Sequence, residues 1–214
     1  MAKDRGYVSE AVIRRMPKYY RYLIEMEKTG IERISSKELS QRMGLTASQI
    51  RQDFNCFGGF GQQGYGYNVS ELKQEIHKIL GLDSQYNMIV VGAGNLGQAI
   101  TNYSNFEKEG FFIKSLFDIN PRLIGNSIRG INIADLDELE SFIKNNPIHI
   151  AAVCTPKEKA QEVVNRLVSC GIKGIWNFAA IDIAVPQDVI VENVHLSDNL
   201  YTLSFRMHDD LGTI

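Results

Sequence analysis

Residues 88–100 read MIVVGAGNLGQAI, and this stretch decides the fold of the second half of the chain. The apolar run 88–91 predicts a buried strand, and residues 92–97 form a G-x-G-x-x-G pattern that opens a helix. Gly92 would make the tight turn, Gly94 would let a pyrophosphate approach the backbone, and Gly97 would let helix and strand pack closely. The pyrophosphate would then lie at the helix N-terminus. The stretch predicts a Rossmann-like dinucleotide-binding domain.

The stretch SLFD, residues 115–118, closes the next predicted strand with an acid. At this place in a dinucleotide-binding domain, an acid accepts hydrogen bonds from the adenosine ribose 2′-hydroxyl and repels a 2′-phosphate. Asp118 therefore favours NAD over NADP. Arg122 follows nearby and weakens that preference, because a cation can pair with a 2′-phosphate.

After residue 84 the chain alternates between strand-like and helical patterns. Apolar runs predict strands at 88–91, 111–117, 148–153, 175–178 and 189–191, with helices at 96–104, 136–144 and 157–169. Such alternation predicts an α/β domain built on a parallel sheet. Ligands bind at the carboxyl ends of parallel strands, so Thr155, Pro156 and Phe178 should complete the pocket.

The first half of the chain has helical spacing and two helix-start signals. Ser35 is followed by Glu38, and Thr46 by Gln49, and each pair matches a capping box in which side chains bind free backbone N–H groups. Gly44 lies between them, where a helix end commonly needs positive φ. These signals predict two short helices joined by a tight turn.

The predicted helices, 37–43 and 47–54, form a helix-turn-helix, although an ordinary helical hairpin has the same pattern. In a helix-turn-helix the second helix enters the major groove of DNA, where arginine pairs with guanine and glutamine with adenine. The outward side chains of that helix would be Ser48, Gln49, Arg51 and Gln52.

Two neighbouring segments favour DNA binding. Residues 14–23, RRMPKYYRYL, are rich in cations, and Pro17 predicts that a helix begins near it. Cations at a helix start oppose the helix dipole, so an external phosphate explains them better. Residues 57–69, FGGFGQQGYGYNV, interleave glycines with aromatic side chains and predict a β-ribbon wing. The predicted contacts from these two segments are Arg14, Arg15, Lys18, Tyr19, Gln62 and Gln63.

Composition fits this division. Residues 1–80 carry 13 Lys and Arg against 9 Asp and Glu, whereas residues 81–214 carry 10 against 16, so the first part suits a polyanion better. No apolar run is long enough for a membrane helix, and the N-terminus lacks the apolar region of a secretory signal. Cys56, Cys154 and Cys170 show no metal-ligand or redox spacing, which predicts reduced thiols in the cytoplasm.

The chain closely resembles the Rex family of redox-sensing transcriptional repressors in the stretches RRMPKYYRYL, SSKELSQRMGLTASQIRQDFNCFGGFGQQGYGYNV, VVGAGNLGQAI and FDINPRLIG. The resemblance implies a homodimer that binds a palindromic operator when NAD+ is plentiful and releases it when NADH rises. It also implies control of genes for NADH reoxidation, fermentation or respiration, with NAD+ and NADH as sensed ligands rather than redox cofactors. The C-terminal segment would be a helix exchanged between subunits, with Leu196, Leu200, Leu203 and Met207 buried against the partner.

The chain departs from the family pattern at a few positions. Gln62 and Gln63 stand where the wing usually has a Lys-Arg pair, and Gln52 stands where a basic residue is common. Fewer cations imply fewer phosphate contacts or a different preferred operator. Ala180 replaces a usual proline. His195 replaces an acid that takes part in the ligand-linked hydrogen bonds of the dimer, so that coupling is expected to be rewired or weakened.

Two other function classes remain open from the residues alone. An NAD-dependent oxidoreductase would share the Rossmann motif, but it needs a proton-transfer group and a substrate domain. His77, His149, His195 and His208 lie in unrelated contexts, and the winged helix leaves little chain for a substrate pocket. A cysteine-based sensor would use Cys56, between the recognition helix and the wing.

The sequence thus predicts a winged helix-turn-helix domain at residues 1–82, a Rossmann-like parallel-sheet domain at 83–194 and an exchanged C-terminal helix at 195–214. We expect no catalytic residue and no metal ligand. The predicted NAD(H)-binding residues are Gly92, Ala93, Gly94, Asn95, Leu96, Gly97, Asp118, Arg122, Thr155, Pro156, Phe178 and Leu196.

Overall fold

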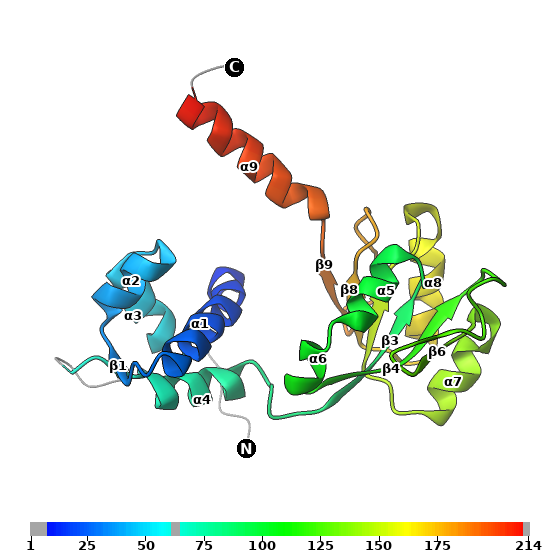
Figure 1. The fold of residues 1–214 in the computed structure, drawn as a ribbon, viewed down its shortest axis with the longest axis horizontal. Coiled ribbons are helices and arrows are strands. Elements are labelled where there is room, and N and C mark those ends of the chain that lie inside the picture. Colours follow the sequence, from blue (N-terminus) through cyan, green and yellow to red (C-terminus); the bar gives the residue numbers. More distant parts are fainter. Residues whose placement is uncertain (1–7, 61–64, 212–214) are drawn as a thin grey trace. The chain divides into compact units, whose positions relative to one another are not determined.

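The computed structural model describes residues 8–60 and 65–211 of the chain (Figure 1). The chain divides into two compact units, Met1–Ser84 and Gln85–Ile214. The first unit has an apolar core of its own, and the second has one apolar cluster on each face of a sheet.

The first unit consists of helices and a short two-stranded ribbon. Its elements are α1 (Glu10–Lys28), β1 (Arg33–Ile34), α2 (Ser36–Met43), α3 (Ala47–Asn55), β2 (Tyr67–Asn68) and α4 (Val69–Ile79). The predicted helix-turn-helix is confirmed as α2 and α3. β2 pairs antiparallel with β1, which precedes α2. The centre of that segment, residues 61–64, lies outside the described residues.

The first helix begins earlier than the sequence predicts. α1 starts at Glu10, so Pro17 lies in its interior rather than at its first turn. Pro17 is exposed, whereas Met16, Tyr19 and Leu23 of the same helix are buried in the core. Burial of this apolar face outweighs the hydrogen bond that proline removes. Because the cations of residues 14–21 lie inside the helix, the prediction that they oppose the dipole at a helix start is wrong.

The two predicted capping boxes differ. The Glu38 N–H donates to Ser35 Oγ over 3.1 Å, and the Ser35 N–H donates to Glu38 Oε2 over 2.9 Å, so the first box is complete. At α3 the Gln49 N–H donates to Thr46 Oγ1 over 3.1 Å, and that half is the only part formed among the described contacts. Gly44 ends α2 with φ 65°, as predicted.

The second unit is a seven-stranded sheet in the described residues, with the order β5-β6-β4-β3-β7-β8-β9. Neighbouring strands are parallel except for the β5–β6 pair. The strands are β3 (Tyr86–Val91), β4 (Phe111–Asp118), β5 (Ser127–Ile128), β6 (Ile131–Asp135), β7 (Ile150–Val153), β8 (Gly174–Asn177) and β9 (Ile190–Asn193). The helices are α5 (Asn95–Asn102), α6 (Asn105–Lys108), α7 (Leu139–Asn145), α8 (Lys157–Ser169) and α9 (Leu196–Leu211), with a 3₁₀ turn, η1 (Leu136–Glu138), before α7. The predicted Rossmann-like parallel sheet is confirmed.

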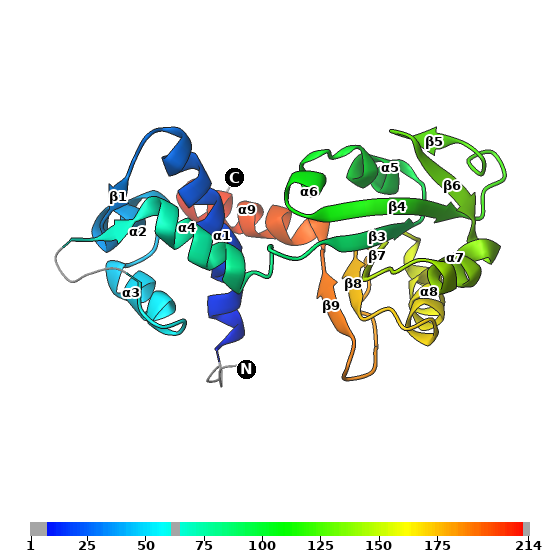
Figure 2. The same cartoon turned by 90° about the horizontal axis from the view of Figure 1, so that it is seen from below.

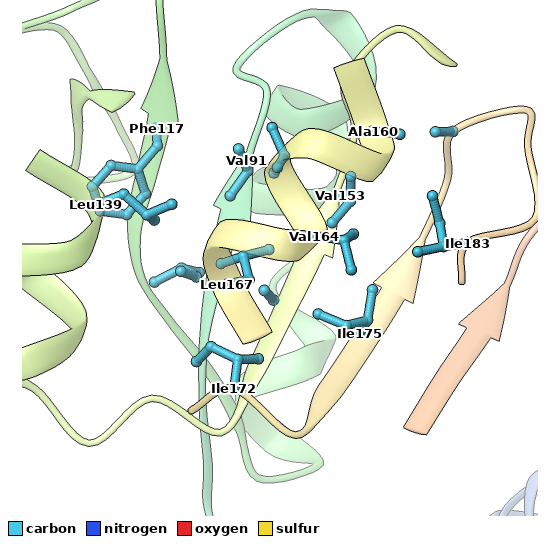
Figure 3. Close-up of a cluster of buried hydrophobic side chains, with 14 of the residues drawn as sticks. Val91, Phe117, Leu139, Val153, Ala160, Val164, Leu167, Ile172, Ile175 and Ile183 are labelled. Carbon is cyan, nitrogen blue, oxygen red and sulfur yellow. The ribbon is translucent and has the colours of Figure 1, made fainter. Parts of the chain in front are cut away.

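Helices cover both faces of this sheet (Figure 2). Successive strand residues point to opposite faces, so Ile89 and Val91 join the cluster under α7 and α8, while Val90 joins the cluster under α5 and α6. Figure 3 shows Val164 and Leu167 of α8 packed over the first of these clusters. Burial on both faces explains why the central strands are almost continuously apolar.

Several boundaries differ from the prediction. β5 and β6 are not predicted, because their apolar residues are few and are interrupted by Arg129, Gly130 and Asn132. The helix predicted over 136–144 begins as η1 and becomes α-helical only at Leu139. The helix predicted over 157–169 agrees with α8 at both ends.

The last helix, α9, carries exposed apolar side chains. Leu200 is 64% exposed, Phe205 66% and Met207 46%, and Leu196, Tyr201 and Leu203 are exposed as well. An isolated helix of this length is marginal in water, so such a face is typical of a helix that is buried against a partner. In the described residues, no helix combines the length and the apolar character that crossing a membrane requires.

Candidate dinucleotide pocket and nucleic-acid surface

A pocket of about 870 Å³ lies at the carboxyl ends of the parallel strands in the second unit. Its lining comes from the segments that follow β3, β4, β6, β7 and β8. The predicted site residues in this lining are Gly92, Gly94, Leu96, Asp118, Thr155, Pro156 and Phe178. In open α/β sheets, ligands bind at this edge.

The three motif glycines each have a separate geometric reason. Gly92 has φ 100°, and a Cβ there would lie 2.6 Å from the Cys154 carbonyl oxygen. A Cβ on Gly97 would lie 2.0 Å from the Gly92 oxygen, so only glycine lets α5 pack against the turn. A Cβ on Gly94 would meet nothing within 4 Å, so the backbone at the start of α5 is open. These residues fit a pyrophosphate, which needs that open approach to the helix N-terminus.

Asp118 is fixed at the edge of the pocket by two backbone groups. Its Oδ2 accepts from the Ala93 N–H over 2.6 Å, and its Oδ1 accepts from the Asn120 N–H over 2.8 Å. A carboxylate oxygen has two lone pairs, so both oxygens can still accept from a ribose hydroxyl. Ala93 therefore contributes by connecting the glycine turn to Asp118.

The lining that follows β7 and β8 includes an aromatic side chain and one unpaired hydroxyl. Phe178 is half-buried and packs edge-on against Trp176, with ring centroids 4.5 Å apart. The hydroxyl of Thr155 is buried and has no hydrogen-bond partner within the described residues. Burial raises the pKa of the neighbouring Cys154 thiol to about 12, so that thiol stays protonated at neutral pH. Phe178 and the unpaired Thr155 hydroxyl together suit a flat ring with a polar substituent.

Five of the predicted residues are not part of the pocket lining: Ala93, Asn95, Gly97, Arg122 and Leu196. Arg122 is exposed, and its backbone N–H donates to Asn120 Oδ1 over 3.0 Å. Leu196 begins α9 and is 63% exposed. A single chain therefore does not bring Leu196 to the predicted ring site. Asn95 begins α5 directly after Gly94.

In the first unit, α3 presents the expected polar face. Ser48, Arg51 and Gln52 are exposed and Gln49 is half-buried, while Ile50 and Phe54 on the opposite side are buried. The Arg51 guanidinium donates to Ser36 Oγ over 3.0 Å, which leaves most of its N–H donors available. This helix can therefore offer one arginine and two amide side chains to base edges.

The cations of α1 have unequal roles. Arg14 is exposed and pairs with Glu10 over 3.0 Å. Lys18 Nζ donates to the Met43 carbonyl over 2.9 Å, so it caps the last turn of α2, where a cation is favoured. Both side chains remain near enough to water to meet a phosphate.

Arg15 and Tyr19 of α1 form a cluster with Asp53 of α3. The Arg15 guanidinium donates to Asp53 Oδ2 over 2.6 Å and to Oδ1 over 2.8 Å, and the Tyr19 hydroxyl donates to Oδ2 over 2.7 Å. Tyr19 is 0% exposed, and Asp53 is 2% exposed. Desolvation, followed by the hydrogen bond to Asp53, raises the pKa of Tyr19 well above its usual value. The two residues hold α1 against α3. Tyr19 is fully buried, so its side chain is not accessible to DNA in this structure, whereas the Arg15 side chain is 22% exposed and its DNA contact stays a prediction.

Asp53 is a structural residue that the sequence reasoning missed. Its spacing from Ile50 and Phe54 places it on the buried side of α3, and this spacing was the available signal. The predicted wing residues Gln62 and Gln63 lie outside the described residues. Within the part of the chain that the structure describes, no group of three or more His, Cys, Asp and Glu could hold a metal ion.

Comparison with known proteins supports both units. Two family models match, "CoA binding domain" over residues 83–181 and "Putative DNA-binding protein N-terminus" over residues 7–55. The redox-sensing transcriptional repressor Rex of Caldanaerobacter subterraneus subsp. tengcongensis is 63% identical over 203 residues, which cover 95% of this chain and 91% of that protein.

Solved structures of a Rex-family repressor called RSP have the same fold. The crystal structure of RSP in complex with beta-NAD+ and operator DNA matches with a TM-score of 0.90 and 60% identity, covering 96% of this chain and 94% of that one. RSP in complex with beta-NADH matches with a TM-score of 0.90 and 57% identity, covering 96% of each chain. These relatives are regulators, which confirms the prediction of a repressor over that of an oxidoreductase. The chain belongs to the Rex family of redox-sensing transcriptional repressors.

Proposed function

We propose that this protein is a homodimer that binds palindromic operator DNA and is released from it when NADH rises relative to NAD+. The observation that carries the proposal is the fit of the glycine turn and Asp118 to a dinucleotide in a chain that also carries an exposed recognition helix. RSP supports it, because it was crystallised with operator DNA and beta-NAD+ and, separately, with beta-NADH. The regulated genes would serve NADH reoxidation, fermentation or respiration, and the protein would act in the cytoplasm.

Within the pocket, the start of α5 would hold the pyrophosphate and Asp118 the adenosine ribose. Thr155, Pro156 and Phe178 would surround the nicotinamide ring, which is cationic in NAD+ and neutral in NADH. Removing the ring from water costs more for the cation, so this end of the pocket would favour NADH. Leu196 would reach the ring only if α9 of the partner subunit supplies it.

The DNA surface would combine base and phosphate contacts. Arg51, Gln52, Ser48 and Gln49 would meet base edges, and Arg14 and Lys18 would meet phosphates. The corresponding division of the chain is a DNA-binding domain at 1–82, a dinucleotide-binding domain at 83–194 and a dimerisation helix at 195–214. In a dimer the two recognition helices must lie one DNA turn apart, roughly 34 Å, so a ligand-driven rotation of subunits would end operator binding.

The test is a titration of a fluorescent palindromic A·T-rich duplex with the protein, repeated with NAD+ and with NADH. We expect NADH to release the DNA and NAD+ to leave it bound. Phe178→Asn should keep operator binding but lose release by NADH, and Arg51→Ala should abolish specific binding. Lys144→Ala removes an exposed cation from the second unit and serves as the matched control. Equal release by both dinucleotides would contradict the proposal.

A further inference from the structure

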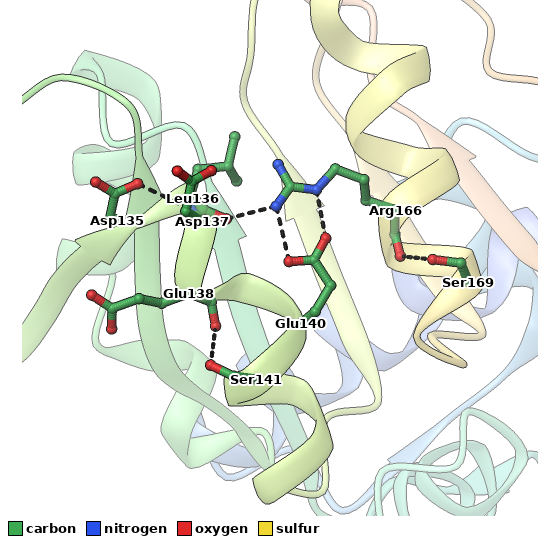
Figure 4. Close-up of polar contacts among 8 residues, drawn as sticks. All are labelled: Asp135, Leu136, Asp137, Glu138, Glu140, Ser141, Arg166 and Ser169. Carbon is green, nitrogen blue, oxygen red and sulfur yellow. Dashed lines mark hydrogen bonds and ion pairs between the residues drawn. The ribbon is translucent and has the colours of Figure 1, made fainter.

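Beyond Asp118, the dinucleotide pocket reaches a bidentate ion pair. Arg166 on α8 donates from Nε to Glu140 Oε1 over 2.6 Å and from Nη2 to Glu140 Oε2 over 2.9 Å (Figure 4). The same Nη2 donates to the backbone carbonyl of Leu136 over 2.9 Å. One guanidinium therefore joins α8 to η1 and to the first turn of α7.

The strand order places these contacts on the adenosine side of the pocket. Asp118 ends β4, and β6, which leads into Leu136, is the neighbour of β4 on the side away from β3. Leu136, Asp137 and Arg166 line the pocket beside Asp118, as does Val163 of α8. A ribose held by Asp118 would thus direct its base toward η1, whereas Phe178, at the end of β8, lies on the other side of β3.

The backbone at this end of the pocket depends on outside support. η1 has only three residues, and a single 3₁₀ turn has little stability of its own. The hydrogen bond to Glu140 is the main cause that raises the pKa of Arg166, and the hydrogen bond to Arg166 is the main cause that lowers the pKa of Glu140. Both groups are therefore charged at neutral pH. The planar guanidinium fork contacts the carboxylate and the Leu136 carbonyl together, which a lysine could not do in this geometry.

We propose that Arg166 is a positioning residue for the adenosine half of NAD+ and NADH, acting through η1 and the Leu136 backbone. The inference rests on the proposed function. The adenosine half is identical in the two dinucleotides, so the Arg166–Glu140 pair affects the affinities for NAD+ and NADH equally. The residues near Phe178 determine which of the two dinucleotides binds more tightly. Loosening η1 weakens both ligands by the same factor, since less of the site is preorganised before binding.

The test compares Arg166→Met and Glu140→Gln with the unmodified protein by calorimetric titration of NADH, NAD+ and ADP-ribose. Arg166→Met should weaken all three by on the order of tenfold, because the guanidinium no longer preorganises η1 before the ligand binds. Glu140→Gln should have a smaller effect, because the amide oxygen still accepts one hydrogen bond. The ratio of NADH to NAD+ affinity should stay constant within about twofold, a range below 0.5 kcal/mol.

The matched control is Lys173→Met, which removes the exposed Lys173–Asp188 ion pair of the same unit and should change no affinity. Thermal melts report folding separately, so a merely structural role would lower the melting temperature without changing the affinities of the folded protein. Unchanged ADP-ribose affinity in Arg166→Met, or an altered NADH-to-NAD+ ratio, would overturn the inference. DNA that stays bound when NADH is added to the unmodified protein would instead contradict the proposed function, while parallel losses of dinucleotide affinity would still support the role of Arg166.

Discussion

The two units use the same bidentate arginine–carboxylate geometry in opposite environments. In the first unit Arg15 forms an ion pair with Asp53, and the Asp53 side chain is 3% exposed. In the second unit Arg166 forms an ion pair with Glu140, and the Glu140 side chain is 44% exposed. The shortest contact is 2.6 Å in both pairs. Geometry alone therefore does not separate them, but solvent access does.

Burial changes what each pair contributes. Asp53 accepts three hydrogen bonds inside a core, so its partners are committed to holding α1 on α3. Removing one partner of a buried pair leaves an uncompensated charge, which is costly. At Glu140 water screens the attraction, and a surface pair of this kind adds little to stability. The first pair is therefore expected to govern folding, and the second to govern the shape of a ligand pocket.

The largest effect should come from Asp53→Ala. The variant leaves the Arg15 guanidinium and the Tyr19 hydroxyl without their acceptor, so the free energy of unfolding of the first unit should fall by about 3–5 kcal/mol. Urea denaturation followed by circular dichroism measures this loss. Glu10→Ala, which breaks the exposed Arg14–Glu10 pair on the same helix, is the control and should change stability by less than about 1 kcal/mol. A first unit that unfolds at the same urea concentration in both variants would show that the Asp53 cluster is not essential.

A combined replacement of the cluster sharpens the comparison. Arg15→Met, Asp53→Leu and Tyr19→Phe together remove every charge and donor and leave only apolar groups. Replacing a whole buried ion pair by packed hydrophobic residues is often neutral, so we expect at least about 2 kcal/mol of the Asp53→Ala loss to be recovered. The same denaturation experiment measures it. If the triple variant is no more stable than Asp53→Ala, specific hydrogen bonds rather than charge balance hold α1 on α3.

The corresponding change in the second unit should be small. Arg166→Met is expected to lower the free energy of unfolding by less than about 1 kcal/mol, because Glu140 remains solvated when its partner is removed. Denaturation in urea without ligand measures this. A loss as large as that of Asp53→Ala would mean that the two pairs are energetically alike despite their different exposure.

The free energy of unfolding of the two units should also depend on pH in different ways. The folded-state pKa of Tyr19 is raised, so its contribution to stability is complete below its usual pKa of 10.0 and is lost as the pH rises above it. The pKa of Glu140 is lowered, so its contribution is present above 4.5 and is lost as the pH falls below that value. Tyr19→Phe should therefore reduce the alkaline decline of the first unit, and Glu140→Gln the acid decline of the second. Unfolding free energies that change with pH exactly as in the unmodified protein would contradict both assignments.

Local chemistry explains which features the sequence could predict. The glycine turn, Asp118 at a strand end and the Ser35–Glu38 box depend on neighbours in the chain, and the structure has all three as predicted. By contrast, the pairing of Arg15 with Asp53 spans 38 positions, and that of Arg166 with Glu140 spans 26. Nothing near Arg15 in the sequence distinguishes a cation that meets DNA from one that meets a buried acid.

The same limit explains the error at Pro17. Its local effect is to end or start a helix, but the buried side of α1, with Met16 and Leu23, keeps the helix continuous through it. Tertiary packing determines where α1 begins and keeps it continuous, and such packing cannot be predicted from a short stretch of neighbouring residues in the sequence. Leu196 is a further case, because in the single chain it is exposed and does not line the pocket.

The apolar face of α9 has a genetic consequence. α9 and α3 lie in different units, so a chain in which a mutation damages the recognition helix α3 still has an intact α9. In the proposed dimer such a chain would form heterodimers with normal chains. Each heterodimer would have one functional recognition helix for an operator that has two half-sites. Loss-of-function alleles in α3 are therefore expected to be dominant over the normal gene, whereas alleles that also truncate α9 should be recessive.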